Sequence, residues 1–303
     1  MKDKRKILII GGTGFIGYHL AKKSLKKGWQ VTSISTNRPK KKRYLSKVSY
    51  IFCDITKKKL LNKKIKKHFD YIVNLGGYVD HTNKKKTFKS HYIGCKNLTE
   101  IFLKNRPLAF VQIGSSIEYG NAKSPQKENA KCNPRSVYGK AKLLSSNHLV
   151  ALFKKQKFPC TILRLYQAYG PKQDLNRFTP VIISGCIKNK KFPCSDGYQF
   201  RDFLHVNDVI DAIFKALTNK NAKGEIFNIG SGKPRKIKNV IQLIRRIIKG
   251  GHPLFGKIKL RKDEFLKVYP NIKKAKKKIN WKPKISFSKG IRSTIKFYNE
   301  QRS

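Results

Sequence analysis

The sequence predicts an α/β protein built on a doubly wound parallel sheet, with a smaller C-terminal lobe beyond it. The first observation is a short apolar run, residues 7–10, that passes directly into glycines. The second is a series of further short apolar runs that lack helical periodicity, as buried parallel strands do. The third is that the stretches between these runs are long enough for crossover helices. The later runs are Val31–Ile34, Val48–Phe52, Tyr71–Leu75, Ala109–Ile113 and Thr161–Leu165.

The first strand is expected to lead into a phosphate-binding loop. Glycines at positions 11, 14 and 17 follow the apolar run, and a helical pattern with one apolar side continues to Gly28. Gly11 would make the turn, Gly14 would admit a phosphate, and Gly17 would allow close packing between helix and sheet. The free amides at the start of that helix would then face a pyrophosphate. The strand and helix around the glycines make a dinucleotide cradle the preferred interpretation.

The strands that follow end in polar or small residues. In doubly wound sheets, ligands bind beyond the carboxyl ends of the strands. Three such positions are Asp54, Asn74–Gly77 and Ser115–Ser116. We therefore expect the chemistry of this protein at that edge of the sheet.

The length of 303 residues suggests two lobes, since domains average roughly 150 residues. Beyond about residue 166 the pattern becomes irregular, and Pro171, Pro180 and Pro193 interrupt it. We expect a dinucleotide-binding domain over residues 1–165, with a returning segment at about 204–230. Residues 166–303 would then form mainly a substrate lobe.

No membrane span or signal peptide is expected, because the apolar stretch after Met1–Lys6 is only four residues long. The six cysteines contain no Cys-x-x-Cys pair, which argues against a zinc site or a disulfide framework. We expect reduced thiols and a cytoplasmic protein.

The formal net charge of +54 raises the possibility of nucleic-acid or membrane-surface binding. However, the lysines recur throughout the chain instead of forming one arm or tail, and no RNA-binding aromatic signature accompanies them. Solvated helix faces are the preferred explanation, and a specific nucleic-acid function is not expected. Non-specific adhesion to polyanions stays open.

Tyr138 and Lys142 are the candidate catalytic pair. They lie four residues apart at the start of an expected helix, which places the two side chains together. A lysine ammonium beside a phenol would lower the pKa of the phenol, as an acid or base at neutral pH requires. Among the pairs with this spacing, only this one lies at the start of an expected helix that follows, a few dozen residues later, a strand ending in a hydroxyl side chain, Ser115. Four other pairs share the spacing: Tyr18/Lys22, Tyr92/Lys96, Tyr119/Lys123 and Tyr269/Lys273.

The chain resembles the extended short-chain dehydrogenase/reductases, also called the NAD-dependent epimerase/dehydratase family of nucleotide-sugar enzymes. The matching segments are the Gly11–Gly17 loop, Asp54–Ile55, Asn74–Gly77, Ser115 with Tyr119–Gly120, Tyr138 with Lys142, Leu163–Arg164 with Tyr169–Pro171, Asn176–Phe178 with Pro180, Asp196–Gly197, Gln199–Phe203 with His205, Val206 and Asp208, Phe227–Gly232, Ala275 and Trp281–Pro283. The resemblance covers nearly the whole chain and implies a Rossmann fold.

The resemblance also implies roles for individual residues. Ser115, Tyr138 and Lys142 would be catalytic, with Lys142 also contacting the nicotinamide ribose. The cofactor would be held by Gly11, Thr13, Gly14, Phe15, Ile16, Gly17, Ser35, Asn37, Arg38, Asp54, Ile55, Leu75, Gly76, Gly77 and Lys142. The substrate, a nucleotide-diphosphate sugar, would be bound by Ser116, Asn176, Arg201 and Arg261, with the two arginines on its diphosphate. No metal is expected, because His81, His91 and His205 lack ligand spacing.

Departures from the family pattern narrow the expected reaction. Members that catalyse 4,6-dehydration carry an Asp-Glu pair after the catalytic threonine, where this chain has Ser116 and Ile117. Hydride transfer at a sugar carbon, expected at C4, is therefore preferred, by a 4-ketoreductase or a 4-epimerase. The alternatives are a 4,6-dehydratase, or a non-catalytic relative that binds NAD(P) or RNA. His91 and Gln167 stand where the family commonly has asparagine.

The second strand ends at Ser35, where NAD-preferring relatives carry an aspartate on the adenosine ribose. Without that carboxylate, and with Asn37 and Arg38 just beyond, both NAD and NADP are acceptable and NADP is slightly favoured. The family resemblance further implies a homodimer formed through two helices beside the sheet.

Overall fold

The computed structural model describes residues 4–78, 80, 82–260 and 264–300. Its centre is a parallel sheet with the strand order β10-β6-β5-β4-β1-β2-β3 among these residues. The chain runs from β1 outward to β3, then crosses back to β4 and continues outward through β5 and β6. This reversal places a crevice between β1 and β4, where doubly wound sheets bind ligands. The strands are β1 (Lys6–Ile10), β2 (Gln30–Ser35), β3 (Val48–Phe52), β4 (Tyr71–Asn74), β5 (Ala109–Ser115), β6 (Cys160–Leu165) and β10 (Ile226–Ile229).

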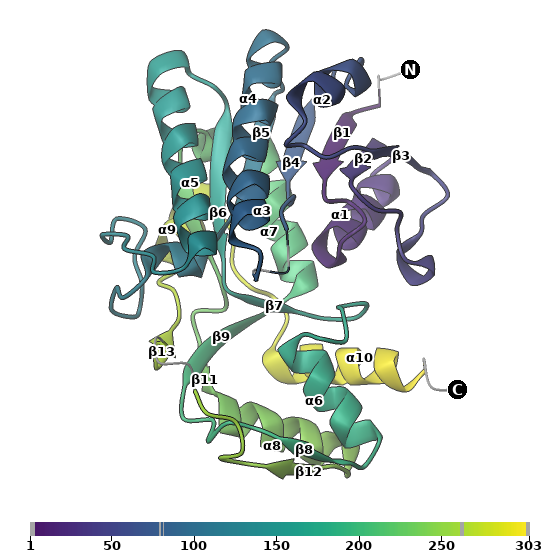
Figure 1. The fold of residues 1–303 in the computed structure, drawn as a ribbon, viewed down its shortest axis with the longest axis vertical. Helices are drawn as coiled ribbons and strands as arrows, with labels where there is room; N and C mark the ends of the chain where they lie inside the picture. The colour runs from purple at the N-terminus through teal and green to yellow at the C-terminus, as the bar shows by residue number, and fades with distance from the viewer. Residues whose placement is uncertain (1–3, 79, 81, 261–263, 301–303) are drawn as a thin grey trace.

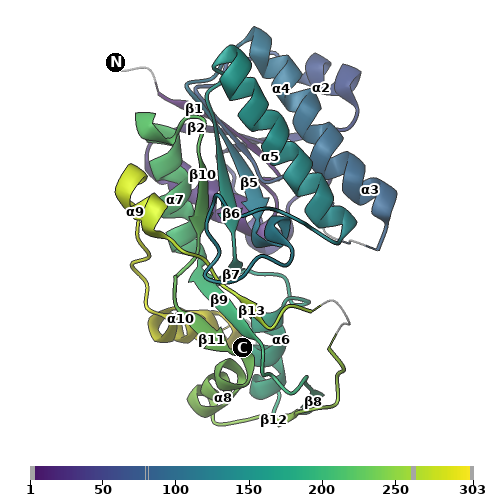
Figure 2. The ribbon, with the colours of Figure 1, turned by 90° about the vertical axis from the view of Figure 1, so that its left-hand side faces the viewer.

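Helices cover both faces of this sheet, as Figure 2 shows. Successive residues of a strand point to opposite faces, so Ile7 and Ile9 pack in one core while Leu8 and Ile10 pack in the other. The first core includes apolar side chains of α1 and α7, and the second those of α2, α4 and α5. The bounds are α1 (Phe15–Lys26), α2 (Lys58–Lys64), α4 (Gly94–Lys104), α5 (Val137–Gln156) and α7 (Val206–Thr218).

One helical segment precedes α4 without a break. It begins with α3 (Lys84–Phe88), which Asn83 caps by accepting a hydrogen bond from the Lys86 amide at 2.9 Å. A π-helical turn, Lys89–Ile93, follows and leads directly into α4. This turn contains His91, which packs beside the start of α5. Such π-helical turns occur frequently at functional sites.

The C-terminal part lies below the large sheet in Figure 1. It has its own apolar core, to which α6, α8, α10 and β9 contribute. In its small sheet β9 pairs with β7, β11 and β13, and a separate pair joins β8 to β12. The elements of this part are β7 (Gln167–Tyr169), α6 (Phe178–Ile187), β8 (Lys191–Pro193), β9 (Phe200–His205), β11 (Pro234–Lys236), α8 (Ile237–Ile248), β12 (His252–Leu254), β13 (Lys267–Val268) and α10 (Phe287–Asn299), while α9 (Lys273–Ile279) packs against the large sheet.

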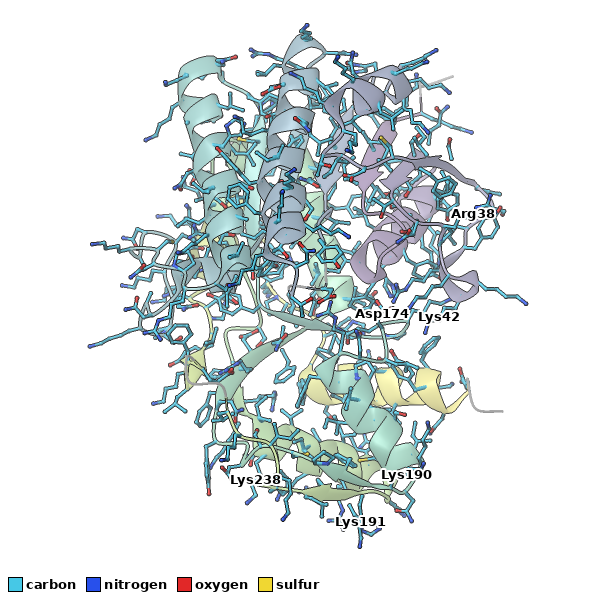
Figure 3. The ribbon with its side chains drawn as sticks, in the orientation of Figure 1. Arg38, Lys42, Asp174, Lys190, Lys191 and Lys238 are labelled. Atoms are coloured by element: carbon cyan, nitrogen blue, oxygen red, sulfur yellow. The ribbon has the colours of Figure 1, made fainter. Side chains whose placement is uncertain are left out.

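A loop after β7 joins the two parts. Buried Arg43 donates hydrogen bonds to the Lys172 carbonyl at 2.6 and 3.0 Å and pairs with Asp174 at 3.0 Å. The His19 ring nitrogen Nε2 donates to the Pro171 carbonyl at 2.9 Å. Figure 3 shows Lys42 and Asp174 where the upper and lower parts meet. These contacts fix how the C-terminal part sits under the sheet.

The predicted fold class is confirmed: the molecule is an α/β protein with a large parallel sheet and a smaller C-terminal part. The strand expected at Val48–Phe52 has those bounds, and the other expected strands differ from the observed ones by a residue or two at an end. Pro180 does not interrupt structure, because it lies in the first turn of α6, where no backbone donor is needed. The division at residue 165 stays a prediction; β10 and the apolar side of α9 both pack with the large sheet.

Candidate active site

The glycine loop has the geometry that a phosphate cradle requires. Gly11 has a φ of +78°, and its amide donates to the Ile34 carbonyl at 2.7 Å. A Cβ atom on Gly17 would lie 2.6 Å from the Cα of Gly12, so only glycine lets α1 begin this close to the loop. Gly14 caps α1 without a side-chain hydrogen bond. The first amides of α1 are therefore available to an anion, and the loop fits a dinucleotide pyrophosphate.

The other residues assigned to the cofactor lie at the carboxyl ends of β2, β3 and β4. The Asp54 carboxylate accepts from the Thr56 amide at 2.8 Å, and the side chain of Ile55 is buried beside it. The Leu75 amide donates to the Ile10 carbonyl at 3.0 Å, which holds Leu75–Gly77 against the end of β1. The strand ends thus converge around the glycine loop.

The end of β2 carries no carboxylate. The Ser35 hydroxyl accepts a hydrogen bond from the Thr13 amide at 3.4 Å, which ties it to the glycine loop. Asn37 and Arg38 are exposed, and the guanidinium carbon of Arg38 lies 5.9 Å from the centre of the Phe52 ring. Figure 3 shows Arg38 at the periphery of the molecule beside β2 and β3.

The three candidate catalytic side chains meet beside β5. Ser136 caps α5 by accepting from the Gly139 amide at 3.1 Å, which places Tyr138 and Lys142 in its first two turns. The half-buried Tyr138 hydroxyl is hydrogen-bonded to Ser115, the last residue of β5. Lys142 is 4% exposed, and its ammonium donates to the Ile113 carbonyl at 2.7 Å and lies 5.9 Å from the centre of the Tyr138 ring.

The expected effect of Lys142 on Tyr138 is wrong for this geometry. Burial raises the pKa of Tyr138 above its ordinary value, and the Ser115 hydrogen bond only partly opposes this. Burial also lowers the pKa of Lys142 to about 8, because the ammonium has left water. The ammonium faces a backbone carbonyl rather than the phenol oxygen, so the phenol gains little from its charge.

Glu118 is a residue of this site that the sequence reasoning missed. It is fully buried, and it accepts hydrogen bonds from the Ser115 amide at 2.8 Å and the Ser146 hydroxyl at 2.8 Å. It also forms an ion pair at 2.9 Å with Arg164, which is 2% exposed. Its negative charge raises the pKa of both Lys142 and Tyr138, although burial has the larger effect on each. The glutamate three residues after Ser115 is a capping-box spacing that could have identified it.

His91 also contacts the catalytic side chains. Its ring meets the Tyr138 ring edge-on, with 4.9 Å between the ring centres. The Ser145 hydroxyl of α5 donates to the His91 carbonyl at 2.8 Å. His91 therefore packs the π-helical turn against the first turns of α5.

A cavity of about 330 Å³ opens beside Ser115 and Tyr138. Ser116 and Arg201, both assigned to the substrate, line it, whereas exposed Asn176 precedes α6 and is not among the lining residues. Arg201 forms an ion pair with Glu264 and donates to the Phe200 carbonyl at 2.8 Å. Arg261 and His81 lie outside the described residues. Lining residues that the sequence did not single out include Gln126, Arg135, Tyr166, Asp202 and Phe265.

The described residues show neither a cluster of metal ligands nor a membrane-spanning helix. They contain no group of three or more His, Cys, Asp or Glu side chains that could hold a metal ion. They also contain no helix that is long and apolar enough to cross a membrane.

Comparison with known proteins gives a consistent family. The model of the NAD-dependent epimerase/dehydratase family matches residues 7–230. A putative UDP-glucose 4-epimerase of Methanocaldococcus jannaschii is 29% identical, over 95% of this chain and 97% of its own. A UDP-N-acetyl-α-D-glucosaminuronate decarboxylase of Bacillus cytotoxicus is 27% identical, over 98% of both chains.

A solved structure extends this comparison to the fold. The UDP-glucuronic acid 4-epimerase of Bacillus cereus, in complex with UDP-glucuronic acid and NAD, has a TM-score of 0.87 and 25% identity. The match covers 98% of this chain and 99% of that one. These relatives are nucleotide-sugar enzymes with more than one reaction among them. The family match over most of the sequence, together with the fold, shows that this chain belongs to the NAD-dependent epimerase/dehydratase family.

Proposed function

We propose that this protein is an NAD(P)-dependent nucleotide-sugar enzyme that transfers hydride at the C4 carbon of a hexose. The observation that carries the proposal is the meeting of Ser115, Tyr138 and Lys142 at the carboxyl end of β5. They stand beside the strand ends that surround the glycine loop. A non-catalytic relative would have no need of all three side chains in this arrangement.

In the proposed reaction each side chain has a separate task. The nicotinamide ring supplies the hydride acceptor and donor when the cofactor is bound. In its phenolate form Tyr138 takes the proton from the C4 hydroxyl as hydride leaves C4 and the hydroxyl becomes a carbonyl; in its neutral form, which burial favours, it gives that proton back on reduction. Ser115 donates a hydrogen bond to the same oxygen. Lys142 holds the nicotinamide ribose through an ammonium fixed by the Ile113 carbonyl.

The residues after Ser115 argue against 4,6-dehydration, because neither of the next two is a carboxylate. Ser116 and Ile117 occupy the positions where dehydratases carry an acid and a base. Glu118 is no substitute, because the Ser115 amide, Ser146 and Arg164 already engage its two oxygens. A 4-epimerase and a 4-ketoreductase both fit the remaining groups. A decarboxylase shares the oxidation at C4, and one relative carries that name.

For the cofactor, we propose that both NAD and NADP bind, with NADP slightly favoured. The end of β2 carries no carboxylate that would repel a 2′-phosphate, and exposed Asn37 and Arg38 follow it. The 4-epimerase of Bacillus cereus is in complex with NAD, which supports the first of the two cofactors. The substrate class, a nucleotide-diphosphate sugar, is supported by the UDP-sugar names of the relatives.

Two features of the cavity suggest how the substrate is held. Ser116 lines the cavity next to Ser115, and Arg201 lines it from strand β9 of the C-terminal part. For Arg201 to bind the diphosphate, its guanidinium must exchange the Glu264 carboxylate for phosphate oxygens. We also propose a homodimer through helices beside the sheet, which light scattering on the purified protein tests. The six cysteines are free thiols, in keeping with a cytoplasmic protein.

The test is to purify the protein and identify any retained cofactor by mass spectrometry. UDP- and dTDP-linked hexoses, UDP-glucuronic acid and 4-keto sugars with NADPH are then offered. Turnover of a hexose without added cofactor supports a 4-epimerase, stoichiometric loss of NADPH supports a 4-ketoreductase, and release of carbon dioxide supports a decarboxylase. Bound cofactor with no turnover of any of these sugars contradicts the proposal.

A further inference from the structure

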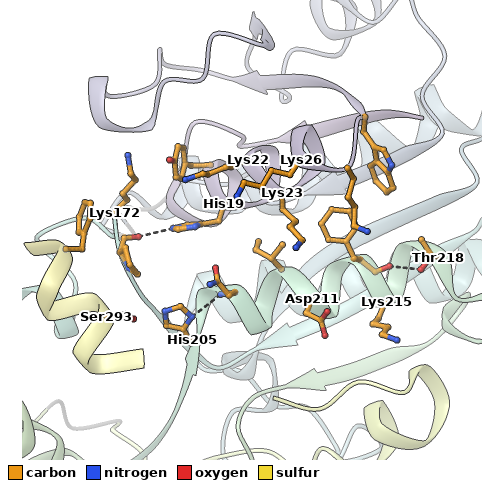
Figure 4. Close-up of a pocket in the computed structure, with 18 residues that line it drawn as sticks. His19, Lys22, Lys23, Lys26, Lys172, His205, Asp211, Lys215, Thr218 and Ser293 are labelled. Carbon is orange, nitrogen blue, oxygen red and sulfur yellow. Dashed lines mark hydrogen bonds between the residues drawn. The ribbon is translucent and has the colours of Figure 1, made fainter. Parts of the chain in front are cut away.

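A second and larger cavity lies on the other side of the molecule from α5. It has a volume of about 840 Å³, and it shares no lining residue with the cavity beside Tyr138. We call it the α1–α7 cavity, because most of its lining comes from those two helices. Pro171 and Lys172 of the loop after β7, and Ser293 and Phe297 of α10, complete it. Figure 4 shows the labelled lysines of α1 facing the α7 residues, with His205 and Ser293 at one end.

The charges around this cavity are strongly unbalanced. Its one lining carboxylate, Asp211, lies 3.5 Å from the ammonium of Lys284 and so has a cation of its own. None of the lining lysines forms an ion pair within the part of the chain that the structure describes. On α1 and its C-terminal cap, Lys22 and Lys26 form one pair four residues apart and Lys23 and Lys27 another, and like charges at this spacing repel each other. The lining lysines are Lys22, Lys23, Lys26, Lys27, Lys172 and Lys215.

His205 adds a buried hydrogen-bond donor to the wall. Its Nδ1 accepts from the Asn207 amide at 3.3 Å and caps α7, so in the neutral ring the proton is on Nε2. The side chain is 5% exposed, and Nε2 has no hydrogen-bond partner among the described residues. A buried N–H group without an acceptor is costly, and an acceptor brought by a ligand would satisfy it.

The two histidines of the cavity stay neutral at physiological pH. Burial lowers the pKa of His205 to about 4. Burial also lowers the pKa of His19 to about 4, and the neighbouring Lys22 and Lys172 charges lower it further. The cationic groups of the cavity are therefore the lysines, while His205 supplies a neutral donor.

We propose that the α1–α7 cavity binds a small molecule that carries two or more phosphate groups, at a site separate from the catalytic one. The volume suits a ligand of nucleotide size. Lysine ammonium groups bind phosphate as point charges, and several around one cavity favour several phosphates. The half-buried Trp29 and the Phe214 ring add an apolar wall. The phosphates can belong to an inorganic chain or to a nucleotide. This inference does not depend on the reaction proposed above.

The probe is inorganic tripolyphosphate, titrated into the full-length protein with saturating NAD and about 0.15 M salt, which screens loose surface attraction. Trp29 fluorescence reports binding, since Trp29 lines the cavity and Trp281, the other tryptophan, is buried in the core. The test variant is Lys22→Gln/Lys26→Gln. The matched control is Lys59→Gln/Lys63→Gln, a pair with the same spacing and charge on exposed α2.

We expect saturable binding that the α1 pair of substitutions weakens about tenfold and the α2 pair leaves unchanged. His205→Asn keeps an oxygen to cap α7 but removes the Nε2 donor, and should weaken binding a few-fold. ATP that binds as tightly as tripolyphosphate, or more tightly, supports the proposal and identifies a nucleotide as the carrier of the phosphate groups. Equal weakening by both lysine pairs, equal affinity for inorganic phosphate, or no saturation overturns it.

Discussion

The catalytic corner, by which we mean Ser115, Tyr138 and Lys142 with the buried Glu118–Arg164 pair beside them, differs from the α1–α7 cavity in how its charges are paired. In the corner, Glu118 and Arg164 are buried and paired, and Lys142 is held by a carbonyl. In the cavity, exposed and half-buried lysines surround a space whose one lining carboxylate, Asp211, is already paired with Lys284. Charges fixed by counterions or carbonyls inside the protein are preorganised for a reaction, whereas ammonium groups without a carboxylate partner can bind the anionic groups of a ligand. This contrast gives the predictions below.

The largest expected effect is on turnover, from Tyr138→Phe. Removing the hydroxyl that moves the proton should lower kcat by about 10²- to 10⁴-fold and change the substrate dissociation constant little. The matched control is Tyr92→Phe, because Lys96 lies 5.9 Å from the Tyr92 ring just as Lys142 lies 5.9 Å from the Tyr138 ring. Steady-state kinetics of the two variants measure the difference. Equal turnover in the two variants would contradict the assignment of Tyr138 as the group that moves the proton.

The next effect is on stability, from Glu118→Gln. This change leaves the buried Arg164 charge without its counterion, which should cost about 3–5 kcal/mol in the free energy of unfolding, measured in urea. Glu118→Gln/Arg164→Gln, which removes both charges, should recover part of that loss. A double variant no more stable than the single one would mean that the pair does not act as a unit.

Glu118→Gln also bears on the catalytic groups. Loss of the negative charge should lower the pKa of Lys142 further, because Glu118 now raises it. If the charged form of Lys142 is needed, the alkaline limb of the pH profile of kcat/KM shifts to lower pH. Glu118→Asp, which keeps the charge, should move this limb less.

A smaller effect is expected on cofactor choice. Ser35→Asp places a carboxylate at the end of β2, where it would accept from a ribose hydroxyl and repel a 2′-phosphate. The ratio of kcat/KM with NAD to that with NADP should rise by about tenfold, which is 1.4 kcal/mol. Arg38→Gln should raise the same ratio less, by weakening NADP alone. If this ratio were unchanged in both variants, the residues at the end of β2 would have no part in choosing between NAD and NADP.

The smallest effect concerns pH and the wall of the α1–α7 cavity. The folded pKa of His205 is about 4, below its ordinary 6.5, so between these values the unfolded chain binds more protons. Stability should therefore fall as pH drops through this window, by up to about 1.4 kcal/mol per pH unit from this group. His205→Asn should make the fall shallower. Buried Asp202, with a pKa raised to about 6, acts in the opposite direction in both proteins and cancels from the comparison. If the free energy of unfolding fell equally with pH in the wild-type protein and in His205→Asn, the lowered pKa of His205 would be contradicted.

The centre of the large sheet could be predicted from the sequence because β1, β4, β5 and β6 are buried almost throughout, which makes apolar residues dominate their sequences. The glycine loop could be predicted from local sequence as well, because Gly11 and Gly17 occupy positions where only glycine fits. Helices α6, α8 and α10 were harder to predict, because their apolar positions face the core of the C-terminal part, which is formed by segments far apart in sequence. Pro180, which suggested a break, lies where a helix tolerates proline.

The candidate site divides in a similar way. Ser115, Tyr138 and Lys142 were identifiable because strand end and helix start bring them together. The Glu118–Arg164 pair spans 46 residues, and no local pattern links its two members. Arg201 was predicted to face phosphate, yet its pairing with Glu264 depends on a chain segment 63 residues away. The depth of burial at Tyr138, which reverses the expected direction of its pKa, could not be judged from spacing.

The most direct test of the central claim follows the hydrogen at C4. A UDP-hexose deuterated at C4 is incubated with the protein and cofactor, and deuterium is then measured in sugar, nicotinamide and water. We predict that the label remains bound to carbon, in the sugar product or the nicotinamide, and that Tyr138→Phe largely prevents its movement. Deuterium released into water by the wild-type protein, or label transfer at the wild-type rate in Tyr138→Phe, would contradict the account.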